Sequence, residues 1–592
     1  MSMNYRFSKK KKGFFDKNED TRIRVASVII AIISCILIVR LFMIMVLQHD
    51  FYSALAAGSQ EIYSQLIPER GDIYVQDSRT GETYPVALNR DVFLMYVDTR
   101  DITSDEAAEH VAAELAETLG YDDEKKFALY LQINKRTDPY EPIEAVLPEE
   151  KMEQIREKKL EGIRFIRKPQ RFYPESALAA HVIGFLGKDK EGNNVGNYGI
   201  EGYFDQELSG TGGFLEGARS ASGGWIPLAG RLFKPAENGV DIMLTLDRTI
   251  QYKACEMLRA AAEVYKAEGA ALVVMNPNTG AILAMCSYPD FNPNSYSKVE
   301  NIQVYNNTSI FTPYEIGSVF KPIPMAAAIN EELVGPDSPF YDPGVRTDIC
   351  STPVRNADSK IYKDTTMTGV LENSINTGMV HIAERLGKNK FLEYIVNFGF
   401  GVKTGISLDT EVSGNIDTLY VNKGNSIDCY AATAAFGQGI TATPLQMVSA
   451  YSAIANGGKL LKPYIVEEIQ YANNKVEKTR PKEVKQVISK RASSLVSGML
   501  VRVVDAGHAT GAGVEGHYVA GKTGTAQIAG QGGYIDATNH SFVGFAPVND
   551  PKFVMLVKFE KPQVRFSSST AAPTFGKIAK FILNYYQVAP VR

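Results

Sequence analysis

A serine and a lysine stand one helical turn apart in YEIGSVFKPIPMAAAIN, residues 314–330. Pro322 is tolerated only in the first turn of a helix, so the stretch predicts a helix that begins near Ser318. Residues i and i+3 of a helix share a face, which brings the amine of Lys321 over the hydroxyl of Ser318. A lysine whose pKa is lowered by burial can take a serine proton, so the pair predicts an activated nucleophile.

The spacing alone is weak evidence, because Ser-x-x-Lys also occurs at Ser8–Lys11 and at Ser295–Lys298. Two further motifs strengthen the interpretation. Ser374-Ile375-Asn376 lies in MTGVLENSINTGMVHIAERLG, which has a helical pattern throughout. Lys522-Thr523-Gly524-Thr525 lies in the strand-like VAGKTGTAQIA, whose small residues would let a peptide pair with the strand edge.

The N-terminal region joins a basic tail, residues 1–24, to an apolar run, residues 25–47, whose one charged residue is Arg40. A helix of that length, at ~1.5 Å per residue, can cross a bilayer core of ~30 Å. The basic flank should stay cytoplasmic, which places the rest of the chain outside. The alternative is a cleaved signal peptide, which the length of the run disfavours. Arg40 would either snorkel to the headgroups or pair with a partner's membrane helix.

Composition narrows the function classes. The 592 residues are 45% hydrophobic and 22% charged with a formal net charge of -4, so no basic field indicates nucleic acid binding. The seven histidines have no metal-ligand spacing, so the sequence indicates no metal site built on them. Cys255, Cys286, Cys350 and Cys429 could form disulfides, but the sequence does not demand them, and Cys286 is expected in the core.

Two regions of different character follow the apolar run. The first is mixed, with polar helical stretches near 104–135 and 148–160 and a glycine-dense segment at 210–230 that suggests turns and a hinge. In the second, helical patterns from 318 to about 500 lie between strand-like segments. The expected strands are 239–247, a hairpin over 269–289, 519–529, 541–548 and 551–560, and further helices are expected at 248–267 and 575–586. Strands at both ends predict one α/β domain whose sheet is closed by distant segments.

The ordered set SVFK, SIN and KTGT resembles the signature of the penicillin-interacting serine enzymes. The chain is similar to class B penicillin-binding proteins, the monofunctional peptidoglycan D,D-transpeptidases, and most of all to their cell-division branch. The other segments that carry the resemblance are RGDIY near Arg70, RFYPESALAAHVIGFLG (171–187), GIEGYFDQELSG (199–210), AFGQGITATPLQMVSAYSAIANGG (435–458) and HSFVGFAPV (540–548). Ile375 at the centre of the middle motif, and Ile316 where the family usually has proline, depart from the pattern but remove no catalytic group.

The resemblance implies an α/β (α+β) penicillin-binding transpeptidase fold, with an antiparallel sheet flanked by helices, an elongated mixed N-terminal pedestal and one N-terminal transmembrane helix. It implies four regions: a cytoplasmic basic tail at 1–24, a transmembrane anchor at 25–47, a pedestal or dimerisation-like domain at 48–236, and the transpeptidase domain at 237–592. Neither a glycosyltransferase domain nor PASTA repeats are expected, and the resemblance implies that no metal or organic cofactor is needed.

The resemblance also implies a role for each motif residue. Ser318 attacks the carbonyl between two terminal D-alanines, Lys321 takes its proton, and Ser374, held by Asn376 and Lys522, relays a proton to the leaving D-alanine. Lys522 and Thr523 bind the substrate carboxylate, with Gly524 beside them on the substrate-binding strand, and the backbone N–H groups of Ser318 and Thr525 form the oxyanion hole.

The expected setting is a single-pass protein of the cell membrane with an extracytoplasmic catalytic domain. The implied partners are peptidoglycan stem peptides on lipid-linked glycan strands, β-lactams, a SEDS-type glycosyltransferase and divisome membrane proteins. The alternatives are a divisome scaffold with a vestigial site and a D,D-carboxypeptidase or β-lactamase. A role in elongation or sporulation rather than division stays open.

Several polar residues receive structural interpretations. Arg70, Arg171 and Glu201 match pedestal positions, and we interpret them as a buried ion-pair network, with a partner contact as the alternative. His540 precedes a predicted strand and is expected in a loop. Residues 308–313, which lead into the Ser318 helix, are expected to support it.

Overall fold

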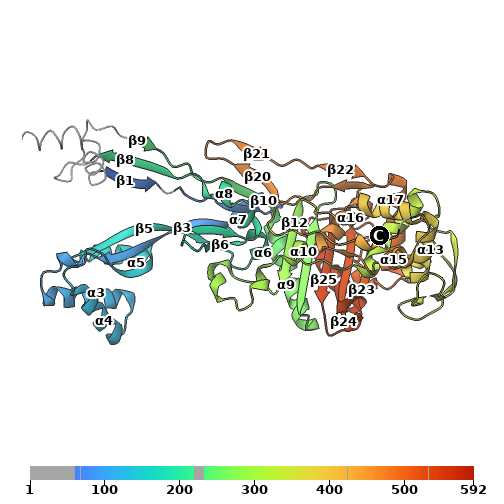
Figure 1. The fold of residues 1–592 in the computed structure, drawn as a ribbon, viewed down its shortest axis with the longest axis horizontal. Coiled ribbons are helices and arrows are strands. Elements are labelled where there is room, and N and C mark those ends of the chain that lie inside the picture. The colour runs from blue at the N-terminus through green and yellow to red at the C-terminus, as the bar shows by residue number, and fades with distance from the viewer. Residues whose placement is uncertain (1–60, 67, 219–231, 423, 531–532) are drawn as a thin grey trace, which may run out of the picture. The chain divides into compact units, whose positions relative to one another are not determined.

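A computed structural model describes residues 61–66, 68–218, 232–422, 424–530 and 533–592 (Figure 1). In this part of the chain, no helix is long and apolar enough to cross a membrane. The anchor expected at 25–47, with Arg40, lies outside the described residues. The described residues divide into two compact units, one made of those within 61–68 and 212–237 and the other of those within 69–211 and 238–592.

The first unit contains an antiparallel three-stranded sheet in the order β1 (Glu61–Leu66), β8 (Gly213–Ala218), β9 (Leu232–Lys234). The prediction of turns over 210–230 is wrong at β8, because every residue of this strand pairs with β1. Residues 219–230 of that segment lie outside the described residues.

The second unit is built on a five-stranded antiparallel sheet in the order β12-β11-β25-β24-β23 (Figure 1). Its strands are β11 (Gly269–Met275), β12 (Ile282–Tyr288), β23 (Ala520–Gly530), β24 (Gly533–Ala546) and β25 (Phe553–Glu560). The predicted hairpin over 269–289 is confirmed, and β25 closes the sheet by pairing with β11. The expected α/β domain with its sheet closed by distant segments is therefore confirmed.

Helices cover both faces of this sheet. Phe542 of β24 packs its ring on Phe575 of the C-terminal helix α18 (Ala571–Tyr585). Adjacent residues of a strand point to opposite faces, so Ser541 faces the other way. On that second face a Cβ added to Gly524 would meet Ser541 Oγ and the Val319 side chain. The Val319 carbonyl accepts a hydrogen bond of 2.6 Å from Tyr451 of α16 (Pro444–Ala455), which places α16 and the 317–320 segment on the face of Ser541.

The region after residue 247 contains further helical elements, of which those at 293–311, 510–512 and 567–569 lie outside the predicted helical patterns and the rest agree with them. They are α9 (Arg248–Tyr265), η3 (Pro293–Lys298), η4 (Ile302–Tyr305), α10 (Thr308–Phe311), η5 (Gly317–Phe320), α11 (Pro322–Asn330), α12 (Met367–Glu372), α13 (Asn376–Leu386), α14 (Lys388–Asn397), η6 (Asp417–Tyr420), α15 (Cys429–Ala434), α17 (Lys490–Asp505), η7 (Thr510–Ala512) and η8 (Ser567–Ser569).

Short antiparallel strand pairs interrupt these helices. They are β13 (Tyr314–Glu315) with β18 (Thr441–Ala442), β14 (Pro339–Asp342) with β17 (Lys363–Thr366), β15 (Val345–Arg346) with β16 (Val354–Arg355), and β19 (Lys459–Leu461) with β22 (Glu483–Gln486).

The region before residue 247 contributes a second sheet with its own helices. Its strands are β2 (Ile73–Gln76), β3 (Thr83–Val97), β4 (Glu141–Pro148) and β5 (Ile163–Phe172), extended by β10 (Asp241–Asp247), β20 (Val466–Gln470) and β21 (Val476–Lys478). The helices α3 (Asp105–Leu119), α4 (Asp123–Ile133) and α5 (Glu149–Glu157) confirm the predicted helical stretches and enclose a separate small core. The remaining elements are η2 (Thr99–Asp101), α6 (Ala180–Ile183), β6 (Phe185–Lys188), β7 (Asn194–Asn197), α7 (Gly199–Tyr203) and α8 (Asp205–Ser209).

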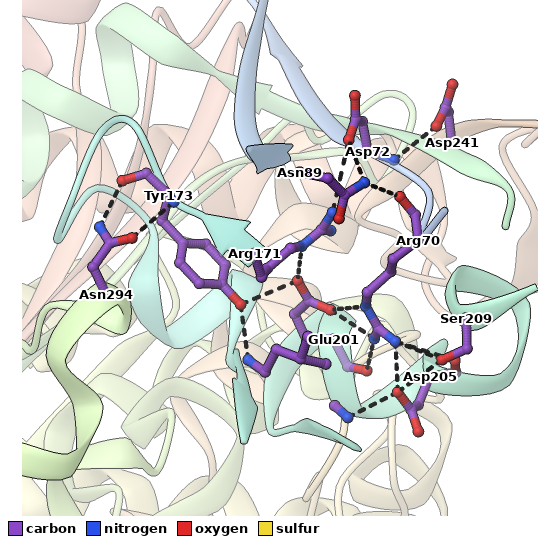
Figure 2. Close-up of polar contacts among 12 residues, drawn as sticks. Arg70, Asp72, Asn89, Arg171, Tyr173, Glu201, Asp205, Ser209, Asp241 and Asn294 are labelled. Carbon is purple, nitrogen blue, oxygen red and sulfur yellow. Dashed lines mark hydrogen bonds and ion pairs between the residues drawn. The ribbon is translucent and has the colours of Figure 1, made fainter. Parts of the chain in front are cut away.

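A buried carboxylate ties three segments of this region together (Figure 2). Glu201 is 0% exposed; one oxygen lies 2.6 Å from Arg70 Nη2 and the other 2.7 Å from Arg171 Nε. Burial alone would raise the pKa of Glu201, but the guanidinium groups of Arg171 and Arg70 hold it below its ordinary value. Tyr173 also contacts the carboxylate, and its backbone N–H donates to Asn294 Oδ1. The prediction of a buried ion-pair network is confirmed.

Four cysteines form two disulfides, Cys255–Cys286 and Cys350–Cys429, which settles a question that the sequence left open. Cys286 is buried, as expected. The prediction that His540 lies in a loop is wrong. His540 is fully buried in β24. The prediction failed because β24 pairs with β23 through polar residues well before the apolar run that begins at 541.

Candidate active site

Ser318 lies in the short 3-10 helix η5, directly before α11. Gly317 adopts φ +63°, a conformation that glycine reaches without strain, and it turns the chain into the helix. Pro322 is at the first position of α11, as expected for a proline in a helix. The predicted helix start near Ser318 is confirmed, with a 3-10 first turn. Ser318 is half-buried, and among the described hydrogen bonds none involves its hydroxyl.

Lys321 points its amine at the middle motif. Its side chain is 0% exposed, and Nζ donates to the Ser374 carbonyl at 2.5 Å, to Asn376 Oδ1 at 2.7 Å and to Ser374 Oγ at 3.0 Å. Burial, and then the charge of Lys522, hold the pKa of Lys321 well below its ordinary value. An amine in this state can accept a proton at neutral pH.

Ser374 sits in a break between two helices, where the sequence pattern predicts one continuous helical segment. Helix α12 ends at Glu372 and α13 begins at Asn376. Ser374 N–H donates to the Leu371 carbonyl and Ile375 N–H to the Val370 carbonyl, the pattern of a Schellman motif. Ser374 therefore occupies, at φ +56°, a left-handed position that usually holds glycine. Such a conformation costs about 1–3 kcal/mol, and it is typical of functional sites.

Lys522 supplies a second buried amine from strand β23. Its side chain is 0% exposed, and Nζ donates to Ser374 Oγ at 3.0 Å. Burial lowers the pKa of Lys522 to about 7. Ser374 Oγ thus lies between two lysine amines, one from each flanking motif.

Glycines let the strand and η5 approach each other closely. A Cβ at Gly524 would lie 3.0 Å from Val319 Cγ1, and a Cβ at Gly317 would lie 3.0 Å from Ala526 Cβ. Gly317 N–H donates to the Gly437 carbonyl at 2.9 Å, and a Cβ at Gly437 would lie 2.2 Å from the Gly317 carbonyl oxygen. The backbones on either side of Ser318 therefore pack directly against the residues that flank Thr525.

The structure brings the three predicted motifs together. Lys321, Ser374, Asn376 and Lys522 form one hydrogen-bonded cluster, with Ser318 one helical turn before Lys321. In the part of the chain that the structure describes, the side chains of Thr523 and Thr525 add no hydrogen bond to this cluster.

Thr525 is exposed, and its hydroxyl donates to Ser567 Oγ at 3.0 Å. Sequence reasoning missed three supporting contacts, those of Ser567, Gly437 and Tyr451. The Gly-x-Gly of AFGQGIT, which contains Gly437, was the available signal for one of them.

Comparisons with known proteins agree with this geometry. Residues 270–580 match the family described as the penicillin binding protein transpeptidase domain, and residues 65–244 match the penicillin-binding protein dimerisation domain. Stage V sporulation protein D of Bacillus subtilis is 36% identical over 88% of this chain and 79% of its own length. The peptidoglycan D,D-transpeptidase FtsI homolog of Mesostigma viride is 29% identical over 75% of this chain and 77% of its own length.

Solved structures agree in fold. Penicillin binding protein 2X from Streptococcus thermophilus aligns with a TM-score of 0.76 at 20% identity, over 89% of this chain and 81% of that one. Penicillin binding protein 3 from Mycobacterium tuberculosis, complexed with aztreonam, aligns with a TM-score of 0.67 at 25% identity, over 89% of this chain and 98% of that one. The chain belongs to the class B penicillin-binding proteins, with a transpeptidase domain preceded by a dimerisation domain.

Proposed function

We propose that this chain is a serine D,D-transpeptidase that cross-links peptidoglycan stem peptides through an acyl-enzyme on Ser318. The observation that carries the proposal is the convergence of two buried lysine amines on Ser374, one of them from Lys321, which lies one helical turn after Ser318. Family membership and relatives named as peptidoglycan D,D-transpeptidases support it. β-Lactams acylate the same serine.

In the proposed acylation step, Ser318 Oγ attacks the carbonyl carbon between the two terminal D-alanines. Lys321 takes the hydroxyl proton, since its lowered pKa leaves the amine neutral. The C–N bond breaks as Ser374 passes its proton to the departing D-alanine amine, and Lys321 returns the proton it took from Ser318 to Ser374 through the 3.0 Å hydrogen bond to Ser374 Oγ. Asn376 holds Lys321, and Lys522 holds Ser374, through the hydrogen bonds of the cluster.

Binding and charge stabilisation come from strand β23 in this proposal. Lys522 and Thr523 attract the terminal carboxylate, and Gly524 leaves room for the donor peptide beside the strand. The backbone N–H groups of Ser318 and Thr525 stabilise the oxyanion. The close packing of Gly317 on Ala526 and of Val319 on Gly524 supports this pairing, because it sets the two segments side by side.

The acyl-enzyme is resolved by an acceptor amine in a transpeptidase and by water in a D,D-carboxypeptidase or β-lactamase. A stem pentapeptide incubated with the full-length chain, with and without an acceptor amine, separates these outcomes by mass spectrometry of the products. We expect cross-linked product that grows with acceptor concentration. Hydrolysed tetrapeptide alone would support the D,D-carboxypeptidase. A chain that sustains growth in cells but turns over no peptide would support the scaffold with a vestigial site.

The pH dependence of acylation follows from the two lysines. Burial, and then the charge of Lys522, lower the pKa of Lys321, so we expect Lys321 to lose its proton first as pH rises. Below the pKa of Lys321 this base is protonated and cannot take the Ser318 proton. Above the pKa of Lys522, about 7 in the free site, the carboxylate of benzylpenicillin loses its cationic partner. We expect the rate of acylation by benzylpenicillin to follow a bell-shaped dependence on pH. The apparent pKa values of its two limbs belong to the coupled pair of lysines rather than to either residue alone. A rate that rises steadily into alkaline pH would contradict this assignment.

The proposed setting is septal wall synthesis at the cell membrane. In it, residues 1–24 form a cytoplasmic tail, 25–47 a single transmembrane anchor, 48–236 the pedestal and 237–592 the extracytoplasmic transpeptidase domain. A SEDS-type glycosyltransferase and divisome membrane proteins are the proposed partners, with Arg40 and the pedestal as contact surfaces. Protease accessibility in intact cells tests the topology, and recruitment of a fluorescent fusion to the septum tests the setting.

A sporulation role is the second candidate, because the Bacillus subtilis relative is named a sporulation protein. Depletion during vegetative growth distinguishes the two. Filamentous cells would support division, and normal growth with defective spores would support sporulation.

A further inference from the structure

Helix α13, which carries Asn376 at its first position, begins without a cap of its own. The residue before it, Ile375, has no side chain that can accept a hydrogen bond. The first N–H groups of a helix lack partners within the helix. Here the N–H groups of Asn376 and Thr377 point to the side-chain oxygen of Asn356, at 3.0 and 3.4 Å.

The amide of Asn356 has only one orientation that satisfies all its neighbours. Asn356 follows β16 and is 3% exposed. Its NH₂ group donates to Asp342 Oδ2 at 2.8 Å and to the Lys360 carbonyl at 3.0 Å. Two acceptors on the nitrogen side and two donors on the oxygen side fix which end faces α13.

Asp342, at the end of β14, anchors this arrangement. It is 0% exposed, and its carboxylate accepts four hydrogen bonds. The donors are the N–H groups of Gly344 and Tyr362, the Asn356 amide, and the Thr377 hydroxyl at 2.5 Å. One buried carboxylate thus holds both the external cap and the second residue of the capped helix.

The same segment also holds the side chain of Asn376. Its Nδ2 donates to the carbonyl of Arg355 at 2.8 Å, and its Oδ1 accepts from Lys321 Nζ at 2.7 Å. The backbone and the side chain of Asn376 are therefore both fixed by the consecutive residues 355 and 356.

We infer that Asn356, held by Asp342, is a positioning residue for this active site: it caps α13 from outside the helix and sets where Asn376 meets the amine of Lys321. The inference rests on the roles proposed for Ser318, Lys321 and Asn376. None of the three sequence motifs contains Asn356 or Asp342.

The test compares Asn356→Ala with Asn307→Ala in the full-length chain. Asn307 is a matched control: it is also 3% exposed and caps a helix, by accepting from Ser309 N–H at 3.1 Å, and its other described side-chain hydrogen bonds go to His181 and Met285 rather than to the cluster. The measured quantity is the second-order rate constant of acylation by benzylpenicillin across pH, with melting temperatures to report folding.

We expect Asn356→Ala to slow acylation at least ~10-fold, because small displacements of catalytic groups are costly. We also expect the acid limb of the profile to move to lower pH, because a displaced Asn376 no longer offers its Oδ1 to the Lys321 ammonium. Asn307→Ala should lower the melting temperature without changing the rate or the profile. An Asn356→Ala chain with the rate and profile of Asn307→Ala would overturn the inference.

If the unsubstituted chain forms no adduct on Ser318, the proposed function fails instead.

Discussion

Replacing Lys321 by methionine is expected to slow acylation by benzylpenicillin about 10²–10⁴-fold, the usual contribution of a general base. Methionine fills similar space but cannot accept the Ser318 proton. Lys321 is fully buried, so its removal abolishes the cost of placing an amine away from water but also leaves its acceptors on Ser374 and Asn376 without this donor. Because the two effects oppose each other, the melting temperature of the variant should change little while the rate falls.

Lys298→Met is the matched control, because Ser295–Lys298 has the same spacing and Lys298 is exposed. This control should be acylated at the rate of the unsubstituted chain. A Lys321→Met chain that keeps that rate would remove Lys321 from the chemistry, and a loss of both rate and melting temperature would indicate a structural role.

Replacing Glu201 by alanine is expected to lower the free energy of unfolding by about 3–5 kcal/mol, as happens when one partner of a buried ion pair is removed. The change leaves the guanidinium groups of Arg70 and Arg171, 8% and 3% exposed, next to each other without their carboxylate. Urea unfolding of the full-length chain measures the loss.

The surface pair Arg167–Glu69 supplies the control for Glu201→Ala. Its side chains are 59% and 55% exposed, so Glu69→Ala should cost no more than about 1 kcal/mol. Glu201→Gln, which keeps the shape but not the charge, should lie between the two. Equal stability of Glu201→Ala and Glu69→Ala would show that the network contributes nothing beyond a surface contact.

The sequence predicted the parts of this protein that local patterns encode. Pro322 after Ser318 marks a helix start, and alternating small residues around Lys522 mark a strand, and both elements are present. Two apolar runs around Asn-Pro-Asn-Thr-Gly also predicted the hairpin over 269–289, and an amphipathic pattern predicted the C-terminal helix. These signals depend on residues close in sequence, so no knowledge of the tertiary structure was needed.

Features that depend on contacts between distant segments were not predictable in the same way. The break at Ser374 was missed because the apolar pattern runs on through both helices, although Asn373 and Ser374 are weak helix formers. His540 was assigned to a loop because its strand is extended by pairing with β23, not by its own apolar residues. The disulfide partners of Cys255 and Cys350 depend on spatial proximity, which spacing does not reveal.

The most direct test of the central claim is the intact mass of the full-length chain after incubation with benzylpenicillin. Ser318→Ala and Ser295→Ala are measured beside the unsubstituted protein. The account predicts one adduct on the unsubstituted chain and on Ser295→Ala, and none on Ser318→Ala. An adduct that persists in Ser318→Ala, or its absence from the unsubstituted chain, would contradict Ser318 as the nucleophile of a working site.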